Sequence, residues 1–252
     1  MTVIAVLALP PREGLVLPAL SETSPLSSMA ATELYEATLV DTIRAIDRSG
    51  ATPLINYPES DQLPAANRTD TEPVADLRAV VADALADPAD VRFEPQVGST
   101  FSARAGNTVT HLLREEGAAS VAVTRGTAPL LSRTVIDGAA MKLRTNDVVV
   151  GPTAEGRVYY AGFTEPIDFA EAFDGVELQR LADRAADADL STAFLGSSPV
   201  VETGGDLRTL IPQLRARIAA ERIVPERTAA FVHEHGLAVV EADDGLELVA
   251  DH

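Results

Sequence analysis

Short, unbroken apolar runs alternate along this chain with longer segments that mix apolar and polar positions. Thr2 to Ala8 is the clearest run, and its continuity is typical of a strand buried on both faces of a parallel sheet. Met29 to Arg48 is of the second kind: Ser27 and Ser28 can cap a helix before it, and Gly50 can end it. The beginning of the chain therefore predicts a buried strand, a loop and a helix.

The same alternation continues through the chain. Further strands are expected at Thr52 to Asn56, Val91 to Glu94, Ser120 to Thr124, Val148 to Val150, Arg157 to Phe163, Ser191 to Leu195 and Leu237 to Glu241. Further helices are expected at Val74 to Leu85, Asn107 to Glu116, Arg133 to Leu143, Gly175 to Ala188, Leu207 to Glu221 and Pro225 to His235. Pro10 to Pro25 and Pro58 to Pro73 are expected to be loops.

Strands that alternate with helices predict an α/β protein in three layers: a mostly parallel central sheet with helices on both faces. We expect one antiparallel member near Val158 to Ala161 and one domain over residues 1–252.

Composition narrows the class of protein. Of the 252 residues, 46% are hydrophobic and 23% are charged, as in ordinary globular proteins. No apolar run is long enough to span a bilayer, and Met1 to Pro10 lacks the basic region and cleavage site of a signal peptide, so we expect a cytoplasmic protein. The chain has no cysteine, which excludes disulfides and thiol nucleophiles.

The charge is far from balanced. The formal net charge is -18, and Lys142 is the single lysine beside 19 arginines. A carboxylate-rich, lysine-poor surface is typical of a protein from a salt-accumulating cell; the alternative is a generic acidic surface encoded by a GC-rich genome. Under either interpretation, partners such as bare nucleic acid or an anionic membrane are disfavoured, because no basic patch is present to replace counterions.

Ligands of open parallel sheets bind at the carboxyl ends of the strands, so the loops that follow strands are the most informative. These loops contain no GxGxxG, Walker, GxSxG or HExxH motif. Four of their segments nevertheless stand out: Leu9-Pro10-Pro11-Arg12-Glu13-Gly14, Thr127-Ala128-Pro129, Gly151 to Gly162 (GPTAEGRVYYAG), and Glu202-Thr203-Gly204-Gly205-Asp206-Leu207.

The order and spacing of these segments resemble a glycosyltransferase-like family related to nucleotide-diphospho-sugar transferases, with a GT-A-type fold. The resemblance extends over roughly residues 1 to 210, and Gly151 to Gly162 is its most specific part. It implies transfer from a nucleotide-diphosphate donor with help from Mg²⁺ or Mn²⁺, and a nucleotide sugar or phosphorylated small molecule as partner. The implied substrate-binding candidates are Pro11, Gly14, Arg125, Thr127, Arg157 and Tyr159, and the implied metal ligands are Glu155, Glu202 and Asp206.

The chain departs from that family at positions that carry chemistry. Leu9, Leu17 and Ala19 stand where the family places basic residues for the phosphates, and leucine cannot donate a hydrogen bond to phosphate. Thr127 stands at the metal-binding aspartate, and a neutral hydroxyl is a poor ligand for a hard divalent ion. Glu155 replaces another aspartate with a side chain one methylene longer, as does Glu202.

Several of these residues also have structural interpretations. Glu155 lies in a glycine-flanked turn, where it is either a solvated acid or a metal ligand. Asp206 can cap the following helix. Arg125 and Arg157 either recognise phosphate or carboxylate, or form salt bridges with the acidic surface.

Two pairs of neighbouring residues are ambiguous in the same way. Tyr159 and Tyr160 alternate along a strand, so we expect one to pack inward and the other to face the cleft or solvent. His233 and His235 do not share a helix face, which favours capping of a helix end over metal binding.

Two functional hypotheses follow. The first is a glycosyltransferase or nucleotidyltransferase that uses a nucleotide-diphosphate donor with a depleted active site. The second is a non-catalytic relative that keeps the fold for ligand binding or assembly. The lost basic residues and the lost carboxylate favour the second hypothesis, whereas Glu155 and Glu202 keep the first open.

The net charge generates a prediction about salt. Added KCl should raise the melting temperature steeply between dilute buffer and molar concentration, because screening shortens the range of charge repulsion to about 3 Å at molar ionic strength. Thermal melts followed by circular dichroism at low and high KCl measure the effect. A midpoint that does not rise with KCl contradicts salt adaptation.

Overall fold

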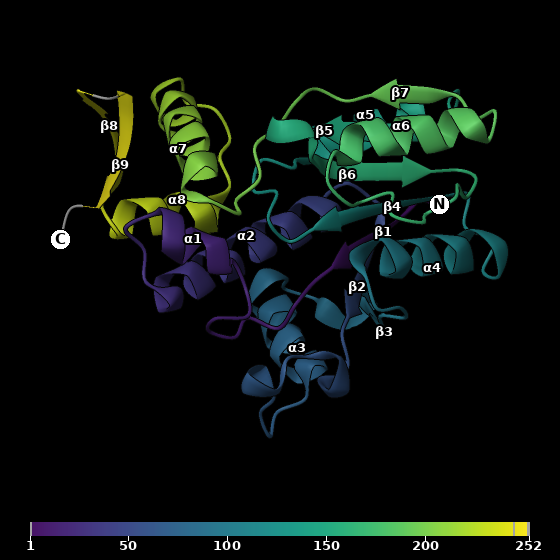
Figure 1. Cartoon of the computed structure of the whole chain (residues 1–252), viewed down its shortest axis with the longest axis horizontal. Helices are drawn as coiled ribbons and strands as arrows, with labels where there is room; N and C mark the ends of the chain where they lie inside the picture. Colours follow the sequence, from purple (N-terminus) through teal and green to yellow (C-terminus); the bar gives the residue numbers. More distant parts are fainter. Residues whose placement is uncertain (1, 244, 251–252) are drawn as a thin grey trace.

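A seven-stranded sheet forms the centre of the computed structural model, which describes residues 2–243 and 245–250. Its strand order is β3-β2-β1-β4-β6-β5-β7 (Figure 1). The strands are β1 (Thr2–Leu7), β2 (Thr52–Tyr57), β3 (Arg92–Pro95), β4 (Ser120–Arg125), β5 (Val148–Pro152), β6 (Val158–Phe163) and β7 (Thr192–Phe194). Two further strands, β8 (Leu237–Ala242) and β9 (Gly245–Ala250), pair antiparallel in a separate sheet.

One strand of the main sheet runs against the others. β6 pairs antiparallel with both β4 and β5, whereas the other neighbouring strands pair in parallel. Only a short 3₁₀ turn, Ala154–Gly156, separates β5 from β6, which is too little chain for the crossover that parallel strands need. The predicted antiparallel member is therefore confirmed, together with the mostly parallel sheet.

Helices cover both faces of the sheet, which confirms the predicted three layers (Figure 1). The helices of one face are α1 (Pro18–Thr23), α2 (Ser28–Asp47), α3 (Pro73–Ala84), α5 (Arg133–Lys142), α7 (Gly204–Ala219) and α8 (Glu226–Glu234). Those of the other face are α4 (Phe101–Arg114) and α6 (Glu177–Asp187). No helix in the described part of the chain is both long and apolar enough to cross a bilayer.

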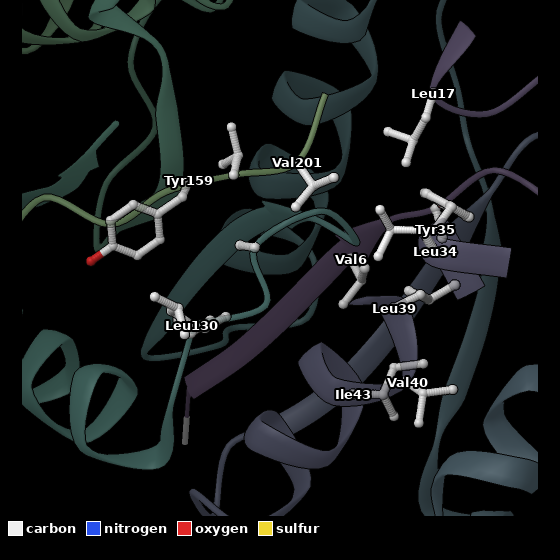
Figure 2. Packing of buried hydrophobic residues seen from close by; sticks show 14 of the residues in the cluster. Val6, Leu17, Leu34, Tyr35, Leu39, Val40, Ile43, Leu130, Tyr159 and Val201 are labelled. Carbon is white, nitrogen blue, oxygen red and sulfur yellow. The ribbon is translucent and has the colours of Figure 1, made fainter. Parts of the chain in front are cut away.

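Strand β1 explains why the apolar run at the start of the chain is continuous. Ile4 and Val6 belong to the hydrophobic cluster beneath α2, whereas Val3 and Ala5 belong to the cluster beneath α4 and α6. The cluster beneath α2 is drawn in Figure 2, where Val6 lies beside Leu39. Successive side chains of a strand point to opposite faces, so a strand covered on both faces needs apolar residues at every position.

The expected elements differ from the structure most clearly in three places. Pro10 to Pro25 is not wholly a loop, because α1 occupies Pro18–Thr23. Helix α4 begins at Phe101 rather than Asn107, and Thr100 caps it by accepting a hydrogen bond from the amide of Ala103. The expected strand Leu237 to Glu241 forms, but as β8 of the small hairpin, which packs against α7.

Asp41 joins α2 to the start of α8. Its carboxylate accepts hydrogen bonds from the amide of Arg227 at 3.1 Å, and from the amide and hydroxyl of Thr228 at 2.8 Å each. Both Asp41 and Thr228 are buried, and burial raises the pKa of Asp41 while the hydrogen bonds act in the opposite direction. The interaction supplies partners for amides at the beginning of α8, which have none within their own helix.

Replacing Asp41 should destabilise the fold markedly. Asp41→Ala leaves the buried amide and hydroxyl of Thr228 without acceptors, so we expect a loss of about 3 kcal/mol in the free energy of unfolding. Chemical denaturation in molar KCl measures it. The matched control is Asp137→Ala, which removes an exposed ion pair with Arg133 and should cost less than about 1 kcal/mol. Equal losses in the two variants would contradict this role of Asp41.

Candidate functional site

A pocket of about 350 Å³ lies at the carboxyl ends of the central strands. Strands β2 and β3 follow on one side of β1, and β4 lies on the other side of β1, so the strand order reverses at β1. Residues after β1, after β3 and after β4 line the pocket, and α4 contributes Phe101 and Arg104. Ligands of open α/β sheets bind at such a reversal point, so this pocket is the candidate site.

The loop after β1 makes the pocket mainly apolar. The lining residues of this part of the chain are Leu9, Leu15, Val16 and Leu17 of the loop, and Pro18 and Ala19 at the start of α1. They include Leu9, Leu17 and Ala19, the positions at which the family resemblance implies phosphate-binding bases. Leu17 itself is buried. Its backbone adopts the left-handed conformation, with φ 47° and ψ 44°, which is strained for leucine.

The side chains of Tyr35 and Arg12 form polar contacts that hold this loop in place. The hydroxyl of Tyr35 donates to the carbonyl of Leu9 at 3.2 Å and accepts from its amide at 2.9 Å; burial raises the pKa of Tyr35, so the hydroxyl keeps its proton. Arg12 forms an ion pair with Asp76 at 2.7 Å and donates to the carbonyls of Asn67 and Thr71. Arg12, the one basic residue of the loop, is therefore turned to a structural use.

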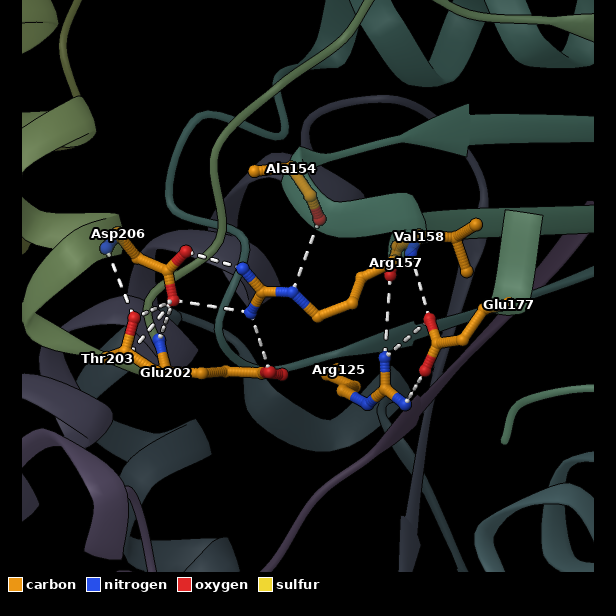
Figure 3. A network of polar contacts seen from close by, with 8 residues as sticks. All are labelled: Arg125, Ala154, Arg157, Val158, Glu177, Glu202, Thr203 and Asp206. Atoms are coloured by element: carbon orange, nitrogen blue, oxygen red, sulfur yellow. Dashed lines mark hydrogen bonds and ion pairs between the residues drawn. The ribbon is translucent and has the colours of Figure 1, made fainter. Parts of the chain in front are cut away.

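Arg125, at the end of β4, is bound by a buried carboxylate. Its guanidinium contacts both carboxylate oxygens of Glu177, at 2.6 and 3.3 Å (Figure 3). It also stacks on the ring of Phe101, 4.2 Å from the ring centroid. Glu177 also accepts the amide of Val158 at 2.8 Å, and its side chain is only 6% exposed. The positive charge of Arg125 is thus largely neutralised within the protein.

Arg157, which follows the turn after β5, forms ion pairs with two acidic residues near the start of α7. Its guanidinium contacts Glu202 at 2.9 Å and Asp206 at 2.6 and 3.2 Å (Figure 3). Asp206 also accepts hydrogen bonds from the amides of Glu202 and Thr203 and forms a capping box with Thr203. The hydrogen bonds to Asp206 raise the pKa of Arg157 above its usual value, so the guanidinium stays charged.

These contacts decide how well the proposed metal ligands fit a divalent ion. Oε2 of Glu202 and both carboxylate oxygens of Asp206 already contact Arg157, and Glu155 is exposed in the turn that precedes Arg157. Within residues 2–243 and 245–250, no group of three or more His, Asp or Glu side chains is arranged to hold a metal ion. Thr127 adds only a neutral hydroxyl, so the residues do not fit Mg²⁺ or Mn²⁺.

The remaining candidates are scattered. Thr127 lines the pocket and is buried, but Pro11 and Gly14 do not line it, although they belong to the loop that does.

Tyr159 and Tyr160 are both buried, which corrects the expectation that one of them faces the cleft or solvent. Tyr159 lies against Gly151, where an added Cβ would come within 2.6 Å of its ring, and its hydroxyl donates to the carbonyl of Gly196. Burial raises the pKa of Tyr159 to about 12.

Sequence reasoning missed several residues of the pocket, among them Gln96, Phe101 and Arg104. All three lie between Glu94 and Asn107, where the sequence pattern predicts neither a strand nor a helix. The signal that could have found them is Thr100, a good N-cap residue before Phe101. Starting the helix there would have directed Phe101 and Arg104 to the carboxyl end of the sheet.

Comparisons with known proteins bear on this architecture. A family model described as uncharacterised proteins conserved in bacteria (DUF2064) matches residues 74–180, which is less than half of the chain. The matched region contains Arg125, Thr127 and Arg157 but not the loop after β1 or the acids of α7. No curated protein matches the chain.

Solved structures share the fold. One is a Desulfovibrio desulfuricans G20 protein described as an assumed nucleotide-diphospho-sugar transferase, with a TM-score of 0.73 and 20% identity over 93% of this chain and 94% of that one. Another is a cytidylyltransferase from Leptospira borgpetersenii serovar Hardjo-bovis (strain JB197), with a TM-score of 0.52 and 9% identity over 92% and 94% of the two chains. The chain has the nucleotide-diphospho-sugar transferase-like fold.

The pair of Arg125 and Glu177 should contribute to stability. Glu177→Gln leaves the Arg125 charge without its partner, and we expect a loss of about 2 to 3 kcal/mol in the free energy of unfolding, moderated by the partial exposure of Arg125. Denaturation in molar KCl gives the value. As control, Glu165→Gln removes the exposed ion pair with Arg114 and should change stability by less than about 1 kcal/mol. If the two variants are equally stable, the Arg125 charge is not held by Glu177.

Proposed function

We propose that this protein uses a transferase-like fold to bind a small molecule in the pocket beside β1 and does not carry out metal-dependent transfer from a nucleotide-diphosphate donor. The observation that carries the proposal is the ion-pair cluster of Arg157 with Glu202 and Asp206. In this cluster the acids that a metal would need serve instead to hold a guanidinium and to cap α7.

The charges around the pocket support the same conclusion. A nucleoside diphosphate brings two anionic phosphate groups, which proteins meet with cations or a metal ion. Arg125 is bound by Glu177, and Arg157 by two carboxylates. The loop after β1 contributes leucines to the pocket, and a leucine cannot offset the charge of a phosphate.

A transferase is the second candidate, and the fold similarity favours it. The likeness to the Desulfovibrio protein extends over 93% of this chain, and the pocket lies at the edge of the sheet where such folds bind ligands. Catalysis would require Glu155 and Glu202 to converge on a metal ion, although Oε2 of Glu202 contacts Arg157. A fold alone does not decide between the two functions.

The expected partner is a small molecule and neither nucleic acid nor a membrane, because the net charge of -18 disfavours polyanionic partners. A cytoplasmic location, a salt-accumulating source and a single domain over residues 1–252 stay predictions from the sequence.

Calorimetric titration separates the two functions. Wild-type protein in molar KCl is titrated with UDP-glucose, GDP-mannose and CTP, each with and without MnCl₂. We expect no binding that depends on Mn²⁺, because the carboxylates are engaged by Arg157 and Thr127 brings no charge. Glu155→Gln is titrated in parallel, with the exposed Glu165→Gln as its matched control.

Micromolar, Mn²⁺-dependent binding of any of these nucleotides that is abolished by Glu155→Gln and kept in Glu165→Gln would overturn the proposal and establish the transferase candidate. Absence of Mn²⁺-dependent binding in all three proteins is the result that the ion-pair cluster predicts.

A further inference from the structure

Arg104 differs from the other arginines around the pocket. It is half-buried on α4 and lines the pocket, and its Nε donates to the carbonyl of Gly98 at 3.0 Å. Among the residues that the structure describes, it forms no ion pair, whereas Arg125 is held by Glu177. Glu202, the carboxylate in the lining, is engaged by Arg157. The pocket therefore offers one positive charge that no carboxylate neutralises.

The walls around that charge are apolar. Leu9, Leu15, Val16 and Leu17 come from the loop after β1, and Phe101 comes from the first turn of α4. The volume of about 350 Å³ lies at the lower end of the range for small-molecule sites. Such walls favour an apolar body over a ribose or sugar, whose hydroxyls would lose their hydrogen bonds with water.

Two oxygens of the lining residues lack partners. Within the described chain, Oε1 of Gln96 and Oγ1 of Thr127 make no hydrogen bond, although both side chains are more than nine-tenths buried. Nε2 of Gln96 donates to the carbonyl of Asn56 at 2.7 Å, which leaves its Oε1 available as an acceptor. Buried polar groups without partners are rare in folded proteins, so these two oxygens distinguish Gln96 and Thr127 from the apolar residues of the lining.

We infer that the pocket binds a small, mainly apolar carboxylic acid, with its carboxylate on Arg104 and its apolar body between the leucines of the loop after β1 and the ring of Phe101. The inference rests on the proposed function and adds the ligand class.

A matched series of probes tests the assignment, because it varies the charge and keeps the apolar body. The probes are 4-phenylbutyrate, 4-phenylbutanol and 4-phenylbutylamine, titrated calorimetrically into the wild-type chain in molar KCl. The net charge of -18 would by itself attract the amine and repel the acid. We expect the reverse, with the acid binding about tenfold or more tightly than the alcohol, because a hydrogen bond to a charged group is worth more than a neutral one.

Two arginine variants locate the charge. Arg104→Gln should remove the preference for the acid and leave the affinity for the alcohol unchanged. Arg133→Gln, which alters an exposed arginine on α5, should behave as wild type. A third variant, Leu15→Asn, should weaken acid and alcohol alike, because it changes a wall and not the charge. Melting temperatures of all variants verify that each is folded.

The inference is overturned if the amine or alcohol binds as tightly as the acid, if folded Arg104→Gln keeps the preference for the acid, or if none of the three probes binds. None of these results affects the nucleotide titrations: the proposed function fails only through Mn²⁺-dependent nucleotide binding, which is a separate measurement.

Discussion

The contact of Arg157 with Asp206 organises the candidate site. It ties the turn between β5 and β6 to the first turn of α7, and its 2.6 Å length and the small exposure of Asp206 make it a well-formed, largely buried ion pair. Asp206 at the same time accepts the amides of Glu202 and Thr203. Removing the guanidinium would leave a buried carboxylate short of a partner, so the arrangement of these loops depends on this contact.

The same contact changes what the edge of the sheet can do. Strand β6 runs antiparallel directly after the turn, and Arg157, the residue before it, contacts Glu202. Val158, the first residue of β6, donates its amide to Glu177, the carboxylate that binds Arg125. Two ion-pair clusters therefore lie side by side (Figure 3). Arg125 pairs with Glu177, and Arg157 pairs with Glu202 and Asp206. Beside these pairs the pocket is left apolar, with Arg104 as its unneutralised cation among the described residues.

The fold and the site were predictable to different extents. Continuous apolar runs such as Thr2 to Ala8 require burial on both faces, and the short link before Val158 requires an antiparallel strand, so sheet and layers followed from local patterns. Helix α4 begins earlier than the expected Asn107, because Thr100 caps it. The earlier start places Arg104 on the helix and in the pocket. The sequence also gave no reason to expect both tyrosines of β6 to be buried, because that depends on Gly151 leaving room for the ring of Tyr159.

By itself the sequence determined the α/β class, the acidic character, the leucines of the loop after β1 and the neutral Thr127. Only the tertiary structure decided which charges meet. Arg125 and Glu177 are 52 residues apart, and Arg157 and Asp206 are 49 residues apart. Residue types and spacing along the chain identify ionisable groups, but an ion pair forms only where the packing of distant elements brings two of them within hydrogen-bond distance and away from water. In this protein that packing joined candidate metal ligands to a candidate phosphate-binding arginine.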